Sequence, residues 1–387
     1  MRKKAVIIIP TYNEKENVQK IVPQIFAVVE KIKNYQVEIL VVDDTSPDKT
    51  YEAVKKMQQK FPRLHLLLNK EKAGLGGAYA KGMAEAFNKL KADYVFEFDA
   101  DGSHDPQKLP EFFTKLDEGY DFVIGGRYRH GGSIDPDWPL LRKFYSIVGN
   151  FVIMTVLTDF RIGDWTSGYR AISKKVYQSV IDEMGDERFS GYTWQIGFLH
   201  KAVRKNFKIT EVPIHFKDRQ IGESKLGSEY IKNTLYYIFK ARRDEILSSR
   251  FIKVALVGGV GFLVQMIALA FFRTFISSVS LANLPANEIA IISNFILNNA
   301  WSFSDKKLSW QQIPFSFLKF NLGSVGSIII QFLITTFGEN VLGIVPIFTL
   351  GNFVFDTGYV YTIIGIFIGL IFNFYIYNKF IWNQKDN

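Results

Sequence analysis

The chain has 387 residues, which is enough for two or three domains, and it carries 47 Lys and Arg against 38 Asp and Glu. The absence of cysteine excludes disulfides, a thiol nucleophile and cysteine-based metal sites. The formal charge of +9 comes without any dense Lys/Arg block and clusters beside apolar segments, so a membrane surface or a phosphate-bearing substrate explains it better than nucleic acid.

Short apolar runs alternate with amphipathic stretches through the first 250 residues, which predicts an α/β fold with a predominantly parallel sheet. The apolar run 5–10 is too short for a signal peptide and leads directly into a strand, so we expect this domain to stay in the cytoplasm. The predicted strands are 6–10, 37–43, 64–68, 94–98 and 122–125, and the predicted helices are 17–33, 49–60, 77–90 and 109–118.

The composition becomes apolar after residue 250. Segments 254–272, 320–337 and 357–378 contain no charged residue, and each is about long enough to cross a bilayer as a helix. A weaker segment, 289–303, carries several Ser and Asn whose polar groups would have to face other helices.

The run 341–355 is either a fifth span or a loop, because Pro346 and Gly351 interrupt it. With four spans the C-terminal Lys379 and Lys385 fall on the side of the N-terminal domain, as the positive-inside rule requires. We therefore predict an all-α transmembrane domain of four helices over 250–387, with the N-terminal domain on the cytoplasmic face.

Two further stretches have an amphipathic pattern. Residues 144–160 fit a core-facing helix and an interfacial helix equally well. Residues 229–249 precede the first span directly, which favours a helix lying on the bilayer. The remaining domain then comprises residues 1–228.

Polar and acidic residues follow several predicted strands, at the sheet edge where open α/β folds bind ligands. After the first strand, Tyr12 could stack on a base and Glu14 could accept hydrogen bonds from a base or ribose, although Glu14 also fits a first helical turn. After the second strand, Asp43 and Asp44 could hold a ribose or position a metal, whereas Asp48 fits a helix cap. The glycine-rich stretch 72–78 lacks the spacing of a phosphate loop and predicts a tight turn.

The fourth strand ends in Asp99-Ala100-Asp101. Two carboxylates at one strand end suit Mg²⁺ or Mn²⁺, which commonly take further oxygen ligands from a substrate phosphate. An isolated pair of this kind is more often a solvated turn. The prediction of a metal site therefore depends on the polar and acidic residues at the other strand ends.

Several motifs in this order resemble known sequences. Residues 10–14 (Pro-Thr-Tyr-Asn-Glu), 41–44 (Val-Val-Asp-Asp) and 99–101 resemble the family 2 glycosyltransferases of the GT-A, Rossmann-like fold. Further motifs closely resemble the dolichyl-phosphate mannose synthases over roughly the first 230 residues: 125–128, 131–133, 166–170, 211–213 and 218–227. Residues 294–303 resemble the GtrA-like membrane domain.

The resemblance implies a set of functional residues. A guanosine site would be lined by Pro10, Tyr12, Glu14, Val42 and Asp44. The metal would be held by Asp99 and Asp101, with Ala100 and Ser103 completing the loop and Ser103 as a further ligand. The diphosphate and sugar would meet Arg127, Arg219 and Lys225, and the lipid phosphate would meet Arg142 and Ser146.

The implied reaction is an inverting, metal-dependent transfer of mannose from GDP-mannose to dolichyl or polyprenyl phosphate. An acceptor phosphate is already ionised, so no strong general base is needed, and His104 is expected to be a loop residue. Fixed cations and a divalent metal would offset the repulsion between the two phosphate groups.

Three alternatives stay open from the sequence. The donor could be UDP-glucose or another UDP-sugar, or the chain could be a lipid-linked-sugar flippase or scaffold with an inactive transferase domain. A processive polysaccharide synthase would usually carry a Gln-x-x-Arg-Trp motif, which this sequence lacks. We expect membrane lipid and the two substrates as partners, and no nucleic acid.

Overall fold

A computed structural model of the chain describes residues 2–70, 74–185, 192–218, 228–272, 274–276, 279–350 and 353–382. The chain divides into two compact units, Met1–Arg242 and Arg243–Asn387. The first is α/β and the second is almost entirely helical.

The first unit is built on a seven-stranded sheet with the order β3-β2-β1-β4-β6-β5-β7. Strand β6 runs antiparallel to both of its neighbours, and every other pairing in this sheet is parallel. The strands are β1 (Lys3–Thr11), β2 (Tyr35–Asp43), β3 (Leu64–Leu68), β4 (Tyr94–Glu97), β5 (Phe122–Gly126), β6 (Arg170–Ser173) and β7 (Ile209–Pro213).

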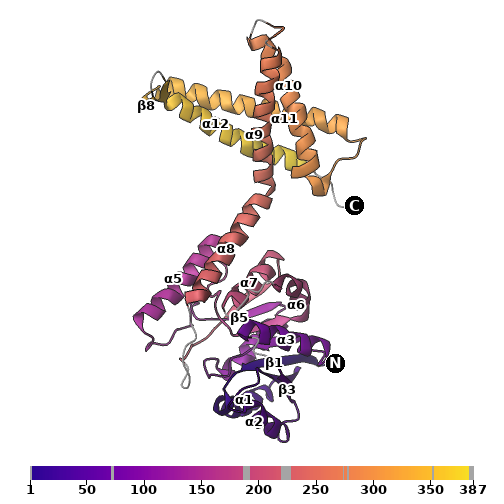
Figure 1. Cartoon of the computed structure of the whole chain (residues 1–387), viewed down its shortest axis with the longest axis vertical. Coiled ribbons are helices and arrows are strands. Elements are labelled where there is room, and N and C mark those ends of the chain that lie inside the picture. The colour runs from indigo at the N-terminus through magenta and orange to yellow at the C-terminus, as the bar shows by residue number, and fades with distance from the viewer. Residues whose placement is uncertain are drawn as a thin grey trace. The chain divides into compact units, whose positions relative to one another are not determined.

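Helices cover both faces of this sheet (Figure 1). They are α1 (Lys15–Val29), α2 (Thr50–Gln58) and α4 (Leu109–Asp117) on one face, and α3 (Gly74–Asn88), α6 (Lys174–Val180) and α7 (Tyr192–Arg204) on the other. Helices α5 (Leu140–Leu157) and α8 (Ser228–Ser248) project from the sheet (Figure 1) and add Ile153, Leu157 and Ile238 to the second core. Alternate residues of a strand point to opposite faces, so Ile7 packs in one core with α1, α2 and α4. Its neighbour Ile8 packs in the other core with α3, α6 and α7. Because both faces are buried, the central strands are continuously apolar.

Helix α3 packs unusually close to the sheet. A Cβ atom at Gly82 would lie 2.7 Å from Cγ2 of Ile8 and 3.1 Å from Cγ2 of Val42. Only glycine fits between α3 and these two strands without moving one of them.

All five predicted strands and the four predicted helices between them are confirmed, with boundaries shifted by a few residues. The fold class is likewise as predicted. Strands β6 and β7 were not predicted, and helix α5 begins four residues before the predicted stretch.

The second unit contains α9 (Arg250–Phe272), α10 (Val279–Leu297), α11 (Ile313–Phe337) and α12 (Thr357–Ile376). The helices pack as two pairs, α9 with α10 and α11 with α12. The indole of Trp382 stacks on Phe303 with ring centroids 4.3 Å apart, in a cluster that also includes Phe295 and Phe320.

The interrupted run that could have been a fifth span does not form a continuous helix at its described positions, because a helical turn ends at Leu342. It forms strands β8 (Pro346–Leu350) and β9 (Phe353–Asp356), which pair antiparallel. Among the described residues, α5 is long and apolar enough to cross a membrane. The bent pair formed by residues 229–248 of α8 and 250–265 of α9 also passes this test when the two helices are taken as one broken span. The four-span topology therefore stays a prediction.

Candidate active site

The carboxyl ends of the parallel strands bring the predicted acids to one edge of the sheet. Asp43 ends β2, Asp99 follows β4, and Arg127 follows β5. Because β6 is antiparallel, the residues that precede it, Thr166 to Tyr169, reach the same edge. The site therefore combines loops that follow strands with one loop that precedes a strand.

The acids after β2 organise the neighbouring loops. The carboxylate of Asp43 accepts hydrogen bonds from the hydroxyl of Thr11 at 2.9 Å and from the hydroxyl and amide of Ser46 at 2.6 and 2.9 Å. Asp44 accepts from Nδ2 of Asn69 at 2.7 Å and from the amide of Gly74 at 3.2 Å, at the start of α3. Asp43 is thus a structural residue of this edge. Asp44 links its own loop to the loop after β3, through Asn69, and to the start of α3, through Gly74.

The side chains of Pro10 and Tyr12 are half-buried at this edge. Glu14 accepts a hydrogen bond from Nδ2 of Asn17 at 2.6 Å, and its amide donates to the hydroxyl of Thr50. The side chain of Val42 is completely buried under α3, so any part it plays in a nucleotide site would come from its main chain.

The Asp99 carboxylate is held on both sides. Its Oδ1 accepts a hydrogen bond of 2.8 Å from the hydroxyl of Tyr79, which is completely buried on α3. Its Oδ2 lies 3.8 Å from Nε2 of His104, and a Cβ atom at Gly168 would come within 3.4 Å of it. Burial and the nearby acids raise the pKa of Tyr79 well above its usual value, so this hydroxyl remains a donor.

The second carboxylate is shaped by its own loop. Oδ1 of Asp101 accepts from the amide of Ser103 at 3.0 Å, and Gly102 between them has a φ of +82°. Ala100 and Ser103 are buried. Since Mg²⁺ and Mn²⁺ are commonly held by one or two carboxylates together with substrate phosphates, this pair fits such an ion. The described residues contain no cluster of three or more acidic or histidine side chains that could hold a metal by themselves.

His104 is a neutral structural residue of this loop. Its Nδ1 accepts a hydrogen bond from the amide of Asp99 at 3.0 Å, and its ring stacks on Tyr169 with centroids 4.7 Å apart. Burial lowers the pKa of His104, the charge of Arg127 lowers it further, and the charges of Asp99 and Asp101 oppose this. The expectation that His104 is a loop residue agrees with this geometry.

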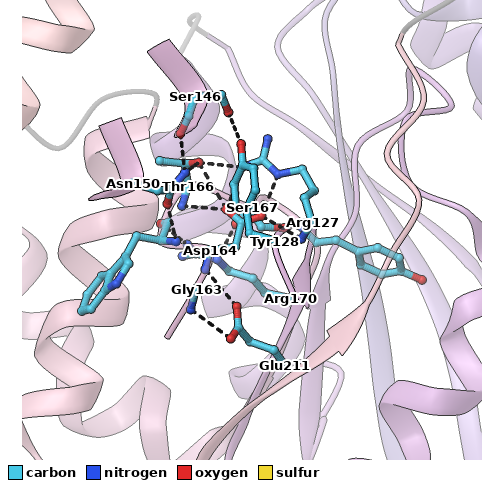
Figure 2. Close-up of polar contacts among 12 residues, drawn as sticks. Arg127, Tyr128, Ser146, Asn150, Gly163, Asp164, Thr166, Ser167, Arg170 and Glu211 are labelled. Atoms are coloured by element: carbon cyan, nitrogen blue, oxygen red, sulfur yellow. Dashed lines mark hydrogen bonds and ion pairs between the residues drawn. The ribbon is translucent and has the colours of Figure 1, made fainter. Parts of the chain in front are cut away.

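Arg127 is buried and paired with a residue that the sequence did not single out. Its Nε and Nη2 donate to the two carboxylate oxygens of Asp164, both at 2.6 Å, and Nη2 also donates to the hydroxyl of Thr166 at 2.6 Å. Burial would raise the pKa of Asp164, but the charge and hydrogen bonds of Arg127 outweigh it and the net shift is downward. Asp164 is therefore ionised and fixes the plane of the guanidinium (Figure 2).

Glu211 holds the loop that carries Asp164. Its carboxylate accepts from the amides of Gly163 and Asp164 at 3.0 and 2.9 Å (Figure 2). It also pairs with Arg129. A Cβ atom at Gly126 would lie 3.0 Å from Oε1 of Glu211, so a larger residue at the end of β5 would require this carboxylate to shift.

The two residues expected at the lipid phosphate both lie in the N-terminal half of α5. Ser146 shares a hydrogen bond of 2.5 Å with the hydroxyl of Tyr128. Arg142 donates to Asp218 at 2.6 Å and stacks 3.9 Å above the ring of Trp138, while its Nε is buried and has no hydrogen-bond partner. An unsatisfied buried donor at this position is consistent with a ligand that supplies an acceptor oxygen.

A buried ion pair lies behind the acids. Glu97 and Arg170 are paired in register between β4 and β6, with Oε2 of Glu97 3.8 Å from Nε of Arg170. The Arg170 guanidinium also donates to the carbonyls of Ser167, Gln195 and Trp165. Burial raises the pKa of Glu97 to about 7, against the opposing charge of Arg170 and a hydrogen bond from Trp194.

Arg219 and Lys225, expected at the diphosphate and sugar, lie outside the described residues. The functional candidates that the sequence missed are Tyr79, Asp164 and Glu211, together with Asn150, which contacts Thr166. No spacing rule connects Asp164 to Arg127, which lies 37 residues earlier. Only its place directly before the motif at 166–170 could have drawn attention to it.

Comparison with known proteins supports the division into two parts. The family model described as glycosyl transferase family 2 matches residues 6–181, and the one described as GtrA/DPMS, transmembrane domain, matches residues 253–382. The dolichol-phosphate mannosyltransferase of Pyrococcus furiosus is 33% identical over 332 residues, which cover 86% of this chain and 89% of that protein. The polyprenol monophosphomannose synthase of Mycolicibacterium smegmatis is 36% identical over 61% of this chain and 85% of that protein. Among solved structures, mannosyl-3-phosphoglycerate synthase from Rubrobacter xylanophilus aligns over 63% of this chain and 74% of that one, with 17% identity and a TM-score of 0.44.

Proposed function

Because this chain belongs to the dolichol-phosphate mannosyltransferases of glycosyltransferase family 2 and carries their membrane domain, we propose that it transfers mannose from GDP-mannose to a polyprenyl phosphate. The product is a polyprenyl phosphate mannose, a donor for later glycosylation. The chain is an integral membrane enzyme, and both substrates follow from the family.

One observation supports this function most directly. The acidic loop Asp99–Asp101 and the guanidinium of Arg127 come from different strands and meet at the loop before β6. Arg127 donates to the hydroxyl of Thr166, and two residues later Gly168 lies against Asp99, where a Cβ atom would come within 3.4 Å of Oδ2. Two carboxylates for a cation and a fixed guanidinium donor at one sheet edge form a suitable site for the diphosphate of a sugar nucleotide.

Asp99 and Asp101 would hold a Mg²⁺ or Mn²⁺ ion, with Ser103 beside them. When bound, such an ion neutralises charge on the departing diphosphate. The hydroxyl of Tyr79 orients Asp99 through its hydrogen bond to Oδ1. Pro10, Tyr12, Glu14, Asp44 and the main chain of Val42 would receive the guanosine at the adjacent strand ends.

Arg127 acts as a positioned hydrogen-bond donor rather than as an isolated positive charge, because Asp164 compensates its charge. Additional cations are therefore needed at the diphosphate, a part that we assign to Arg219 and Lys225 by the resemblance of their motifs. Arg142 and Ser146 would bind the acceptor phosphate, and binding would compete with the ion pair between Arg142 and Asp218.

In this reaction an acceptor phosphate oxygen attacks the anomeric carbon of mannose from the side opposite the diphosphate. The new carbon–oxygen bond forms as the bond to the diphosphate breaks, and the electron pair leaves with GDP. The configuration inverts in a single displacement. No described residue has to remove a proton, because the attacking phosphate is already ionised.

We further propose that the membrane domain spans the bilayer with α9, α10, α11 and α12 and that the transferase unit lies on the cytoplasmic face. The distribution of Lys residues at the loops supports this orientation. Labelling of single cysteines introduced at positions 306 and 345 tests it, since the chain has no natural cysteine. We expect position 306 alone to be labelled from the cytoplasmic side.

The activity is tested with the full chain in detergent or nanodiscs, a polyprenyl phosphate, Mg²⁺ or Mn²⁺, and labelled GDP-mannose or UDP-glucose. We expect label to enter the lipid phase from GDP-mannose, and only when the metal is present. Transfer from UDP-glucose alone would reassign the donor. No transfer from either, with intact substrate binding, would indicate an inactive transferase unit that serves the membrane domain.

A further inference from the structure

Helix α5 has an unusual attachment to the transferase unit. Its buried residues are Asn150, Ile153 and Leu157, all in its C-terminal half, whereas Leu140, Leu141, Phe144 and Ile147 in its N-terminal half are at least half exposed. The proposed acceptor residues Arg142 and Ser146 lie in that N-terminal half. Asn150 is therefore the first anchored position after them, and the only polar one of the three.

Asn150 joins α5 to two consecutive residues of the loop before β6. Its Oδ1 accepts from the amide of Trp165 at 2.8 Å, and its Nδ2 donates to the hydroxyl of Thr166 at 3.2 Å and to the carbonyl of Ser146 at 2.9 Å. With a relative exposure of 2%, the amide has little contact with water. Removing it would leave buried groups without partners.

The directions of these hydrogen bonds are determined by their partners. Arg127 can only donate to Thr166, and the ionised Asp164 can only accept from it at 3.3 Å. The hydroxyl of Thr166 therefore gives its one proton to Asp164, and it can only accept from Asn150. An aspartate at position 150 could not supply that donor.

These contacts close a ring around the site (Figure 2). Arg127 contacts Thr166, which contacts Asn150; one turn earlier on α5, Ser146 contacts Tyr128, the residue next to Arg127. A displacement of α5 would therefore disturb both the contact of Asn150 with Thr166 and the contact of Ser146 with Tyr128. The same hydrogen bonds therefore fix the position of the Arg127 guanidinium, on the donor side, and of helix α5, on the acceptor side.

We propose that Asn150 is a positioning residue that fixes the acceptor-side half of α5 relative to Arg127. The expected effect on acceptor binding rests on the proposed function, because Arg142 and Ser146 bind the acceptor phosphate only in that reaction. The mechanical part, that Asn150 holds the N-terminal half of α5 in place, rests on geometry alone.

The test compares Asn150→Ala and Asn150→Asp with Ile153→Ala in the full-length protein. Ile153 is equally buried three residues later on the same helix, so its truncation controls for lost packing. We expect both Asn150 variants to raise the KM for polyprenyl phosphate about tenfold, with the KM for GDP-mannose within twofold of wild type. Ile153→Ala should lower the thermal midpoint and leave both KM values unchanged.

Hydrogen exchange of the substrate-free protein provides a readout independent of activity. Amides of residues 141–149 should exchange at least fivefold faster in both Asn150 variants. Unchanged exchange overturns the inference. Faster exchange with an unchanged acceptor KM also overturns it, because Asn150 would then be a structural residue only. If the wild-type protein transfers no mannose while the exchange result holds, the proposed function fails and the anchoring of α5 stands.

Discussion

The hydroxyl of Tyr79 donates a 2.8 Å hydrogen bond to Oδ1 of Asp99, from a ring that is completely buried on the neighbouring helix. The carboxylate proposed to hold the metal is therefore oriented by a residue that solvent cannot reach. Such supporting hydrogen bonds commonly change metal affinity by one to two orders of magnitude.

Replacing this tyrosine tests the relationship. Tyr79→Phe keeps the ring and removes only the hydroxyl, so we expect Mn²⁺ affinity in the presence of GDP to fall about tenfold. Electron paramagnetic resonance titration of Mn²⁺ measures it. The matched control is Tyr177→Phe, a buried tyrosine of the same core whose ring packs on Phe87 with centroids 4.7 Å apart. Equal affinities in the two variants would show that the hydrogen bond has no part in metal binding.

The acidic pair itself gives the strongest expected effect. Asp99→Ala and Asp101→Ala should each lower metal-dependent mannose transfer by about three orders of magnitude, because both the cation and its charge compensation are lost. Transfer from labelled GDP-mannose measures this loss. Asp105→Ala is the control, since Asp105 accepts from the amide of Gln107 at the start of a helical turn and should cost only about 1 kcal/mol of stability. Near-normal transfer in either member of the pair would remove the basis for a metal site there.

The buried pair of Arg127 and Asp164 predicts a large loss of stability. Asp164→Asn leaves the guanidinium buried without a counter-charge, which typically costs about 3–5 kcal/mol. We expect the thermal midpoint of the full chain to fall by roughly 10 °C. Glu111→Gln, which breaks an exposed pair with Lys108, should cost less than about 1 kcal/mol. A similar midpoint for the two variants would show that Asp164 contributes no more than a surface carboxylate.

Glu97 makes stability depend on pH in an unusual direction. Its pKa is raised from 4.5 to about 7 in the folded protein, so between these values the folded state holds a proton that the unfolded chain has released. Its contribution to stability should therefore decrease with rising pH across this range, by on the order of 1 kcal/mol per pH unit, and level off above about pH 7.

The measurement compares thermal midpoints of the wild type and Glu97→Gln from pH 5 to pH 8. The advantage of the wild type should shrink with rising pH up to about pH 7 and then stay constant. Glu183→Gln serves as the control, because the pKa of Glu183 is lowered by its hydrogen bond with Lys205, and its contribution should be constant over this range. Parallel curves for wild type and Glu97→Gln would contradict the raised pKa.

The parts of the fold that could be predicted from the sequence are those with strong local patterns. Strand β3 has the predicted limits, because four leucines around a single histidine, between turns, leave little choice. Strand β6 escaped prediction because it has four residues and begins with Arg170, a buried charge whose partners are Glu97 on another strand and carbonyls of distant segments. Strand β7 carries Glu211, whose carboxylate is satisfied by main-chain amides of a distant loop.

The same limit applies to the site. Asp99 and Asp101 stand out in the sequence because a single residue separates them and they follow a strand. Asp164 and Asn150 could not, because what defines them is contact with residues far away in sequence. Val42 shows the converse: its motif predicts a place in the nucleotide site, and the structure adds that its side chain faces the core.

The close approach of α3 to the sheet at Gly82 also affects the proposed metal site. Tyr79 lies one helical turn before Gly82 on the same helix, so the gap between α3 and β1 also sets the reach of its hydroxyl. Alanine at position 82 would move the helix outward and lengthen that hydrogen bond without altering any ligand. We therefore expect Gly82→Ala to weaken metal binding at the proposed site from a position that would contact neither the ion nor a substrate, by changing a spacing rather than a chemical group.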